Sequence, residues 1–167
     1  MGSGLFRAGM RRLAGGVTII TSLDAEGRRC GITATAVCSL STDPPSLVAC
    51  VNRETSIAAV VEQRGVFVVN VLATAQRAVA ETFAGRTGHQ REDRFSVGDW
   101  SVAETGAPVL ADAAVSFDCR LAESVTFGTH MILIGRVEAT RCADGEAPPL
   151  LYGDGAFLTT CLASSPV

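Results

Sequence analysis

The 167-residue sequence contains no lysine, only two histidines and few aromatic residues. All 14 basic residues are arginine, the formal net charge is -3, and aromatic residues form 5% of the chain. Proteins that bind nucleic acid usually carry a surplus of basic side chains, so this balance predicts no nucleic-acid partner. The shortage of histidine and aromatic side chains also leaves no obvious active site.

Long hydrophobic runs are absent as well. Hydrophobic residues form 47% of the chain, but glycine, threonine or arginine interrupts them every few positions. No run approaches the roughly 18 to 20 residues that span a bilayer. The opening residues MGSGLFRAGMRRL lack the apolar segment of a secretory signal. We therefore expect a soluble, cytoplasmic protein without a membrane partner, with one domain over residues 1–167.

The cysteines show no metal-binding spacing. Six of them are spread through the chain without a CxxC pair: Cys30, Cys38, Cys50, Cys119, Cys142 and Cys161. With only two histidines to assist them, this pattern does not favour zinc. Most of these cysteines fall where a strand pattern needs a small apolar residue, and free cysteine is commonly buried. We predict reduced core thiols and no metal site.

Common motifs of nucleotide-binding and hydrolytic enzymes are also missing. The sequence has no GxGxxG after a strand, no GxxxxGK[ST], no HExxH and no GxSxG. These absences exclude a dinucleotide-binding α/β domain, a P-loop, a zinc peptidase of that type and an α/β-hydrolase.

Hydrophobic patterning predicts mostly strands. The expected strands cover residues 16–22, 29–40, 46–52, 66–72, 113–128, 129–142 and a last short strand within 150–161. The expected helices cover residues 5–13, 54–65 and 73–85, and the stretch 86–108 is predicted to be a long loop. Antiparallel hairpins dominate this order. The chain is therefore predicted to be mainly β with flanking helices, as a closed or split β-barrel and not a doubly wound parallel sheet.

Small hydroxyl residues are concentrated in GITATAVCSLS, residues 31–41. On a strand, they would form a shallow surface where the backbone and the hydroxyls of Thr33, Thr35, Ser39 and Ser41 are available to a flat ligand. The alternative is that threonine is simply a good strand former.

Six ordered motifs carry a resemblance to a known family. They are GVTIIT, GITATAVCSLSTDPPSLVACVNRETS, FVVNVL, GAPVL, GTHMILIGRV and PLLYGDGAF. Together they resemble the short-chain flavin reductases over about residues 7–160, the reductase components of two-component flavin-dependent monooxygenases. VNRETS and GTH look closest to reductases that serve 4-hydroxyphenylacetate hydroxylation and pyrimidine degradation. Many relatives have GDH where this chain has Thr129, a difference that we interpret as a mark of the subgroup.

The resemblance implies a Greek-key split β-barrel of the FMN-binding type, a homodimer, and a partner monooxygenase that receives reduced flavin. It implies FMN or FAD as the flavin and NADH or NADPH as the hydride donor. Because these two cofactors supply the reacting rings, the protein mainly has to stack them, and no catalytic triad is needed. Two alternatives stay open: a non-catalytic flavin-binding sensor or carrier on the same barrel, and an interaction protein without a cofactor.

Residue roles follow from the same resemblance. The isoalloxazine ring is expected to contact the strand Thr33, Ala34, Thr35, Ala36, Val37 and Cys38. Ser39 and Ser41 are expected to bind the ribityl chain or phosphate, and Cys50, Val51 and Asn52 to line the flavin from the next strand. Thr55 and Ser56 would hold phosphate at a helix N-terminus, where free N–H groups attract anions, although they could equally be a helix cap alone.

The remaining candidates are less specific. His130, in GTH, is expected beside the nicotinamide and flavin, where it would position the nicotinamide or neutralise charge on reduced flavin, although a lone histidine is often structural. Phe83, Phe95 and Tyr152 are candidate ring contacts that could instead belong to the core. The loop that carries Arg86, His89, Arg91 and Arg94 could reach a pyrophosphate or a 2′-phosphate, or could be a solvated charged loop.

Overall fold

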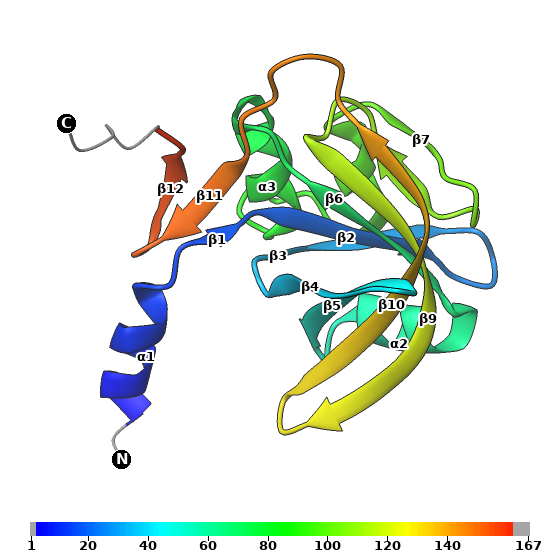
Figure 1. Cartoon of the computed structure of the whole chain (residues 1–167), viewed down its shortest axis with the longest axis horizontal. Coiled ribbons are helices and arrows are strands. Elements are labelled where there is room, and N and C mark those ends of the chain that lie inside the picture. Colours follow the sequence, from blue (N-terminus) through cyan, green and yellow to red (C-terminus); the bar gives the residue numbers. More distant parts are fainter. Residues whose placement is uncertain (1–2, 162–167) are drawn as a thin grey trace.

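The computed structural model describes residues 3–161. Its main sheet is antiparallel and seven-stranded, in the order β3-β2-β6-β9-β10-β5-β4 (Figure 1). The strands of this sheet are β2 (Thr18–Leu23), β3 (Arg29–Ala34), β4 (Val37–Thr42), β5 (Pro45–Asn52), β6 (Val66–Val71), β9 (Val115–Phe127) and β10 (His130–Cys142). Two smaller sheets contain β1 (Gly15–Gly16), β11 (Leu150–Gly153) and β12 (Ala156–Thr159), and β7 (Trp100–Val102) and β8 (Pro108–Leu110).

Five helical segments complete the described chain. The α-helices are α1 (Ser3–Arg11), α2 (Ser56–Arg64) and α3 (Arg77–Phe83), and the 3-10 helices are η1 (Thr74–Gln76) and η2 (Arg91–Ser96). As predicted, α2 ends at Gly65, whose φ of 68° is the left-handed conformation that glycine adopts without a Cβ clash. No helix in the part of the chain that the structure describes is long and apolar enough to cross a membrane.

The long β9–β10 hairpin joins the two halves of the main sheet. The first half of β9 pairs with β6, and the first half of β10 pairs with β5. The sheet therefore curves around a core that contains Phe67, Val69, Leu133 and Met131 from both halves. Phe67 is fully buried, which stabilises the fold by about 2–3 kcal/mol. The end strands β3 and β4 do not pair with each other, so the barrel is open: a split β-barrel, as predicted.

One predicted strand is wrong. Residues 29–40 form two strands, β3 and β4, which lie at opposite ends of the main sheet. After Ala34 the chain no longer pairs with β2 and crosses to β5. There the carbonyl of Ala36 accepts a hydrogen bond from the Cys50 N–H at 2.9 Å. No glycine or proline marks this break, so the sequence pattern contained no signal for it.

The expected 86–108 loop and the expected last strand contain more regular structure than predicted. The 86–108 stretch includes η2 and β7, because Phe95 is buried and anchors this segment to the core. Residues 150–161 form a hairpin of β11 and β12, whose turn places Asp154 and Gly155 at φ values of 50° and 82°. The predicted short strand is thus a pair of strands.

The cysteine prediction holds only in part. All six cysteines are free; Cys119 is buried, Cys30 and Cys50 are half-buried, and the other three are exposed. Within residues 3–161, no group of three or more His, Cys, Asp or Glu side chains is arranged to hold a metal ion.

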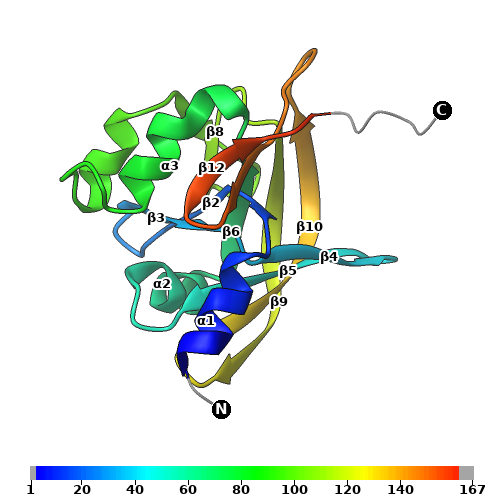
Figure 2. The ribbon, with the colours of Figure 1, turned by 90° about the vertical axis from the view of Figure 1, so that its left-hand side faces the viewer.

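A second core cluster holds α3, η2 and β11 together. The rings of Phe83, Phe95 and Trp100 contact one another with centroid distances of 4.9 to 5.3 Å. This aromatic cluster fixes the end of α3 against β3. Figure 2 shows the result: β3 lies between α3 on one side and α2 on the other.

Candidate functional site

The end strand β3 borders three adjoining hollows. The helix pocket, of about 430 Å³, is lined by Gly31, Ile32, Thr33, Thr55, Ser56, Ile57, Phe83, Ala84 and Arg94. The strand pocket, of about 260 Å³, is lined by Ile32, Thr33, Ala34, Thr35, Ala36, Cys50, Val51, Asn52 and His130. The hairpin pocket, of about 170 Å³, is lined by Val17, Thr33, Ala34, Thr35, Ala80, Ala84, Arg86, Tyr152 and Phe157. Thr33 lines all three, so they form one groove along β3.

The backbone of β3 supplies polar groups to this groove. In the main sheet β3 pairs only with β2, and in an antiparallel pair the N–H and C=O groups of alternate residues point away from the partner strand. The carbonyl of Gly31 is one of these, since it faces the Arg94 guanidinium at 3.5 Å. By the same alternation, the backbone N–H and C=O groups of Thr33 and Thr35 also point away from β2. The Thr33 hydroxyl itself is occupied, because it donates to the Ala80 carbonyl at 2.8 Å.

Gly31 allows the close approach of an aromatic ring at the edge of the groove. A Cβ at this position would lie 2.8 Å from Cε1 of Phe83. Any side chain here would therefore push Phe83 away from β3. The glycine keeps α3 and its aromatic cluster tight against the strand that borders the groove.

The N-terminus of α2 points its free N–H groups into the helix pocket. Thr55 is the N-cap residue, but its side chain makes no capping hydrogen bond. Its hydroxyl instead donates to the Asn52 carbonyl at 2.6 Å, and the Asn52 side chain accepts the Glu54 N–H at 2.9 Å. The first N–H groups of the helix, at Ser56 and Ile57, are therefore left for an external acceptor such as an anion.

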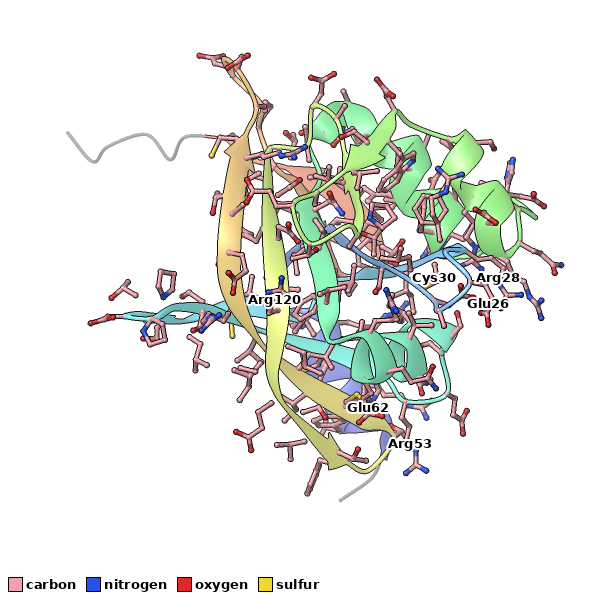
Figure 3. All side chains as sticks on the ribbon, turned by 90° about the vertical axis from the view of Figure 1, so that its right-hand side faces the viewer. Glu26, Arg28, Cys30, Arg53, Glu62 and Arg120 are labelled. Atoms are coloured by element: carbon pink, nitrogen blue, oxygen red, sulfur yellow. The ribbon has the colours of Figure 1, made fainter. Side chains whose placement is uncertain are left out.

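Arg94 provides a positive charge in the same pocket. Its guanidinium donates to the carbonyls of His89 and Phe83, each at 3.3 Å, which ties η2 to α3. Arg53, which lies shortly before the N-terminus of α2 in sequence, instead points outward from the ribbon (Figure 3).

The whole groove is electropositive although the chain is acidic. None of the residues that line the three pockets is Asp or Glu. Over the described residues, the arginines paired with carboxylates are Arg28, Arg29, Arg77 and Arg136. Arg86 and Arg94, the two arginines in the groove, are not among them. Their charges are thus available to an anionic ligand.

His130 and Cys50 border the strand pocket. His130 is the first residue of β10 and lies opposite Asn52 of β5. Its side chain is exposed, with Nδ1 2.9 Å from the Thr129 hydroxyl. Burial raises the pKa of the Cys50 thiol above its ordinary value, and the nearby Cys38 raises it further. Cys50 is therefore a neutral thiol near pH 7.

Two aromatic rings and an arginine form the wall of the hairpin pocket. Tyr152 and Phe157 pack edge to face, with ring centroids 5.3 Å apart. Arg86 donates to the Tyr152 hydroxyl at 3.2 Å. Its guanidinium carbon lies 5.7 Å from the Tyr152 ring centroid and 6.0 Å from that of Phe157.

Most residues predicted from the sequence meet in this groove. The structure brings together Thr33, Ala34, Thr35, Ala36, Cys50, Val51, Asn52, Thr55, Ser56, Phe83, Arg86, His130 and Tyr152. Phe95 does not reach it, because it is only 5% exposed and packs behind Phe83.

The residues of β4 lie elsewhere. Val37, Cys38, Ser39 and Ser41 line a separate hollow of about 500 Å³, together with Phe117 of β9 and Val137 of β10. They are not brought to the groove because β3 and β4 diverge after Ala34. Their expected flavin contacts remain predictions.

The groove also contains residues that were not assigned from the sequence. Gly31, Ala84 and Phe157 contribute to its walls. Glycine, alanine and phenylalanine carry no reactive group that would mark them in the sequence, and only packing reveals their place in the groove. His89 and Arg91, which were grouped with Arg86 and Arg94, do not line any of the three pockets.

Comparison with known proteins identifies the family. Residues 10–160 match the family model of the flavin reductase like domain. The chain belongs to the flavin reductase-like family. This confirms the resemblance that the six motifs indicated.

Several members of the family are similar to this chain over most of its length. "FMN reductase (NADH) RutF 1" of Methylorubrum extorquens is 45% identical over 154 residues, covering 92% of this chain and 75% of that protein. "FMN reductase (NADH) RutF" of Agrobacterium fabrum is 49% identical over 141 residues, covering 84% of this chain and 79% of that protein.

Solved structures of the family share the fold. A flavin reductase domain protein from Arthrobacter superposes with a TM-score of 0.88 at 26% identity, over 99% of this chain and 100% of that chain. The NADH:FAD oxidoreductase SgcE6 of Streptomyces globisporus, in complex with NAD and FAD fragments, gives 0.85 at 25% identity, over 96% and 93%. Nitrilotriacetate monooxygenase component B from Mycobacterium thermoresistibile gives 0.84 at 26%, over 95% and 89%.

Proposed function

We propose that this protein is an NADH-dependent flavin reductase, an oxidoreductase that reduces FMN or FAD. The relatives named FMN reductase (NADH) support this activity. The structural observation that carries the proposal is the groove along β3: an electropositive hollow with free backbone groups, in a chain of net charge -3. FMN, FAD and NADH each combine a flat ring system with negatively charged phosphate. A groove of this kind suits all of them.

The donors in the groove fit a flavin. The outward backbone groups of β3 can bind the polar edge of the isoalloxazine ring, and the small side chains of Ala34 and Ala36 let a flat ring lie close to the strand. The free N–H groups of α2 and the guanidinium of Arg94 together suit the flavin phosphate. The ring would then lie in the strand pocket and the phosphate in the helix pocket.

When bound in this groove, the flavin would supply the chemistry, as the acceptor of a hydride from the nicotinamide. The protein has to hold the two rings face to face at reacting distance and exclude other poses. We assign this positioning to the β3 backbone beneath the flavin and to His130 at the end of the strand pocket. His130 would contact the nicotinamide or balance charge on the reduced flavin, since no proton transfer is required for the hydride step.

We further propose that the reduced flavin leaves the groove and serves a partner monooxygenase. The three pockets are open to solvent, and a family member of the same fold is a monooxygenase component. Release is testable without the partner. Under anaerobic conditions, a trace of protein with NADH should bleach a large excess of free FMN. Bleaching that stops at one equivalent per chain would contradict release.

A homodimer is the assembly that we propose. Apolar side chains are exposed on α1, which stands away from the barrel in Figure 1: Leu5 is 77% exposed and Phe6 63%. Phe127, at the tip of the β9–β10 hairpin, is 82% exposed. Exposed apolar groups of this size commonly mark interfaces. Light scattering should give twice the 17.3 kDa of one chain, and a mass of one chain would exclude the dimer.

The reductase proposal is tested by NADH consumption. Purified protein is mixed with NADH and, in turn, FMN, FAD or riboflavin, and the absorbance of NADH is followed. We expect turnover that depends on added or bound flavin. A protein that retains flavin tightly but oxidises neither NADH nor NADPH would instead be a flavin-binding sensor or carrier. No flavin binding at all would reject both functions.

A further inference from the structure

Arg86 is fixed in place at the hairpin side of the groove. It follows the C-terminus of α3, where the Arg86 N–H bonds to the Glu81 carbonyl at 3.0 Å and the Gly85 N–H bonds to the Thr82 carbonyl at 3.0 Å. This pair of bonds, with Gly85 at a φ of 76°, is the Schellman closure of a helix. The backbone of Arg86 is thereby held rigidly, and its side chain is aimed by the Tyr152 hydroxyl.

The charge of Arg86 has spare hydrogen-bonding capacity. A guanidinium has five N–H donors, and the hydrogen bond to Tyr152 uses one of them. No ion pair joins Arg86 to a carboxylate in the described residues. The hairpin pocket therefore presents a fixed cation with several unused donors, beside the two aromatic rings of Tyr152 and Phe157.

Arg77, close to the same aromatic ring, is an arginine with only a structural role. Its guanidinium carbon lies 5.0 Å from the Phe157 ring centroid, similar to Arg86. However, its Nε is paired with the Glu81 carboxylate at 3.0 Å, and Arg77 does not line the pocket. The two arginines share one aromatic neighbour and differ in whether their charge is neutralised.

The two groove arginines line different pockets, which share Thr33 and Ala84. Arg94 lines the helix pocket with the α2 N-terminus, and Arg86 lines the hairpin pocket. Arg94 and the α2 N-terminus are enough to bind the single phosphate of FMN. A pyridine dinucleotide that stacks its nicotinamide on the flavin brings a pyrophosphate of two further negative charges. Among the residues that line the three pockets, Arg86 is the arginine that remains to meet them.

We propose that Arg86, positioned by Tyr152, binds the pyrophosphate of the pyridine dinucleotide and sets the affinity of the enzyme for NADH. This inference rests on the proposed reductase function. It divides the groove into a flavin-phosphate subsite around Arg94 and a dinucleotide subsite around Arg86. The planar guanidinium suits this role because it can donate two parallel hydrogen bonds to phosphate oxygens.

The test compares Arg86→Gln, Tyr152→Phe and the matched control Arg77→Gln with the unmodified protein. NADH is varied at saturating FMN, and FMN affinity is measured separately by flavin fluorescence. In Arg86→Gln we expect the KM for NADH to rise about tenfold or more, with kcat and the Kd for FMN changed less than about twofold. Tyr152→Phe should raise the KM for NADH less, and Arg77→Gln should leave it unchanged.

A hydride donor without phosphate separates binding from chemistry. With 1-benzyl-1,4-dihydronicotinamide in place of NADH, Arg86→Gln and the unmodified protein should react at the same rate. An unchanged KM for NADH, a weakened Kd for FMN instead, or an effect on NADPH alone would each overturn the proposal. If the unmodified protein oxidises neither donor, the reductase function itself fails, which is a different outcome from failure of the Arg86 assignment.

Discussion

The assignment of the flavin phosphate to Arg94 and α2 makes a quantitative prediction. Arg94→Gln removes the guanidinium from the helix pocket and leaves a shorter, uncharged polar side chain. Hydrogen bonds to charged groups contribute about 1.5–3 kcal/mol, so losing a phosphate contact should weaken FMN binding by about 10- to 150-fold. Riboflavin has the same ring and ribityl chain without the phosphate, and its affinity should change less than about twofold.

Arg94→Gln also removes hydrogen bonds within the protein, which affects the stability of the fold. The distances to the carbonyls of His89, Phe83 and Gly31 are 3.3, 3.3 and 3.5 Å. These lie beyond the usual range of about 2.7–3.2 Å, so we expect a stability loss of only about 1 kcal/mol from their removal. That loss applies equally to FMN and riboflavin binding and cancels in the ratio of their Kd values.

The assay is a fluorescence titration of FMN and of riboflavin against the unmodified protein, Arg94→Gln and the control Arg91→Gln. Arg91 belongs to the same short helix η2 but does not line the groove. We expect the ratio of the two Kd values to change only in Arg94→Gln. If riboflavin and FMN lose affinity equally in this variant, Arg94 supports the fold of the pocket and does not bind phosphate.

Three further predictions concern stability and turnover. Gly31→Ala should destabilise the protein by about 1–3 kcal/mol in thermal or urea unfolding, because the new Cβ would lie 2.8 Å from Phe83, whereas Gly16→Ala, with nothing within 4 Å, should change little. Burial raises the pKa of the Cys119 thiol from 9.0 to about 12. Its contribution to stability is therefore complete below pH 9 and is lost as pH rises from 9 towards 12, by up to about 1.4 kcal/mol per pH unit. Urea unfolding at several pH values should show a shallower decline in Cys119→Ala, and an equal decline would contradict this assignment. His130→Ala should lower kcat/KM for NADH about tenfold without changing the urea midpoint, and full activity would remove His130 from the site.

Strand content and most element positions could be predicted from the sequence. The runs that became β5, β6 and β9 are rich in apolar and β-branched residues and were expected within a residue or two of their bounds. The division of residues 29–40 could not be predicted, because both halves have the same small and β-branched composition. What separates β3 from β4 is a change of hydrogen-bonding partner, from β2 to β5, which is decided far away in the sequence.

The sequence by itself determined the chemistry available to this protein: ordered family motifs, small hydroxyl residues concentrated in residues 31–41, and arginine as the only permanently charged basic residue. Only the tertiary structure decided how that chemistry is distributed. Arg86 and Arg94 are close in sequence, yet they line different pockets of the groove, while Arg77 is paired with Glu81. The physical reason is that charge pairing and burial depend on which elements pack together, and neither periodicity nor composition carries that information.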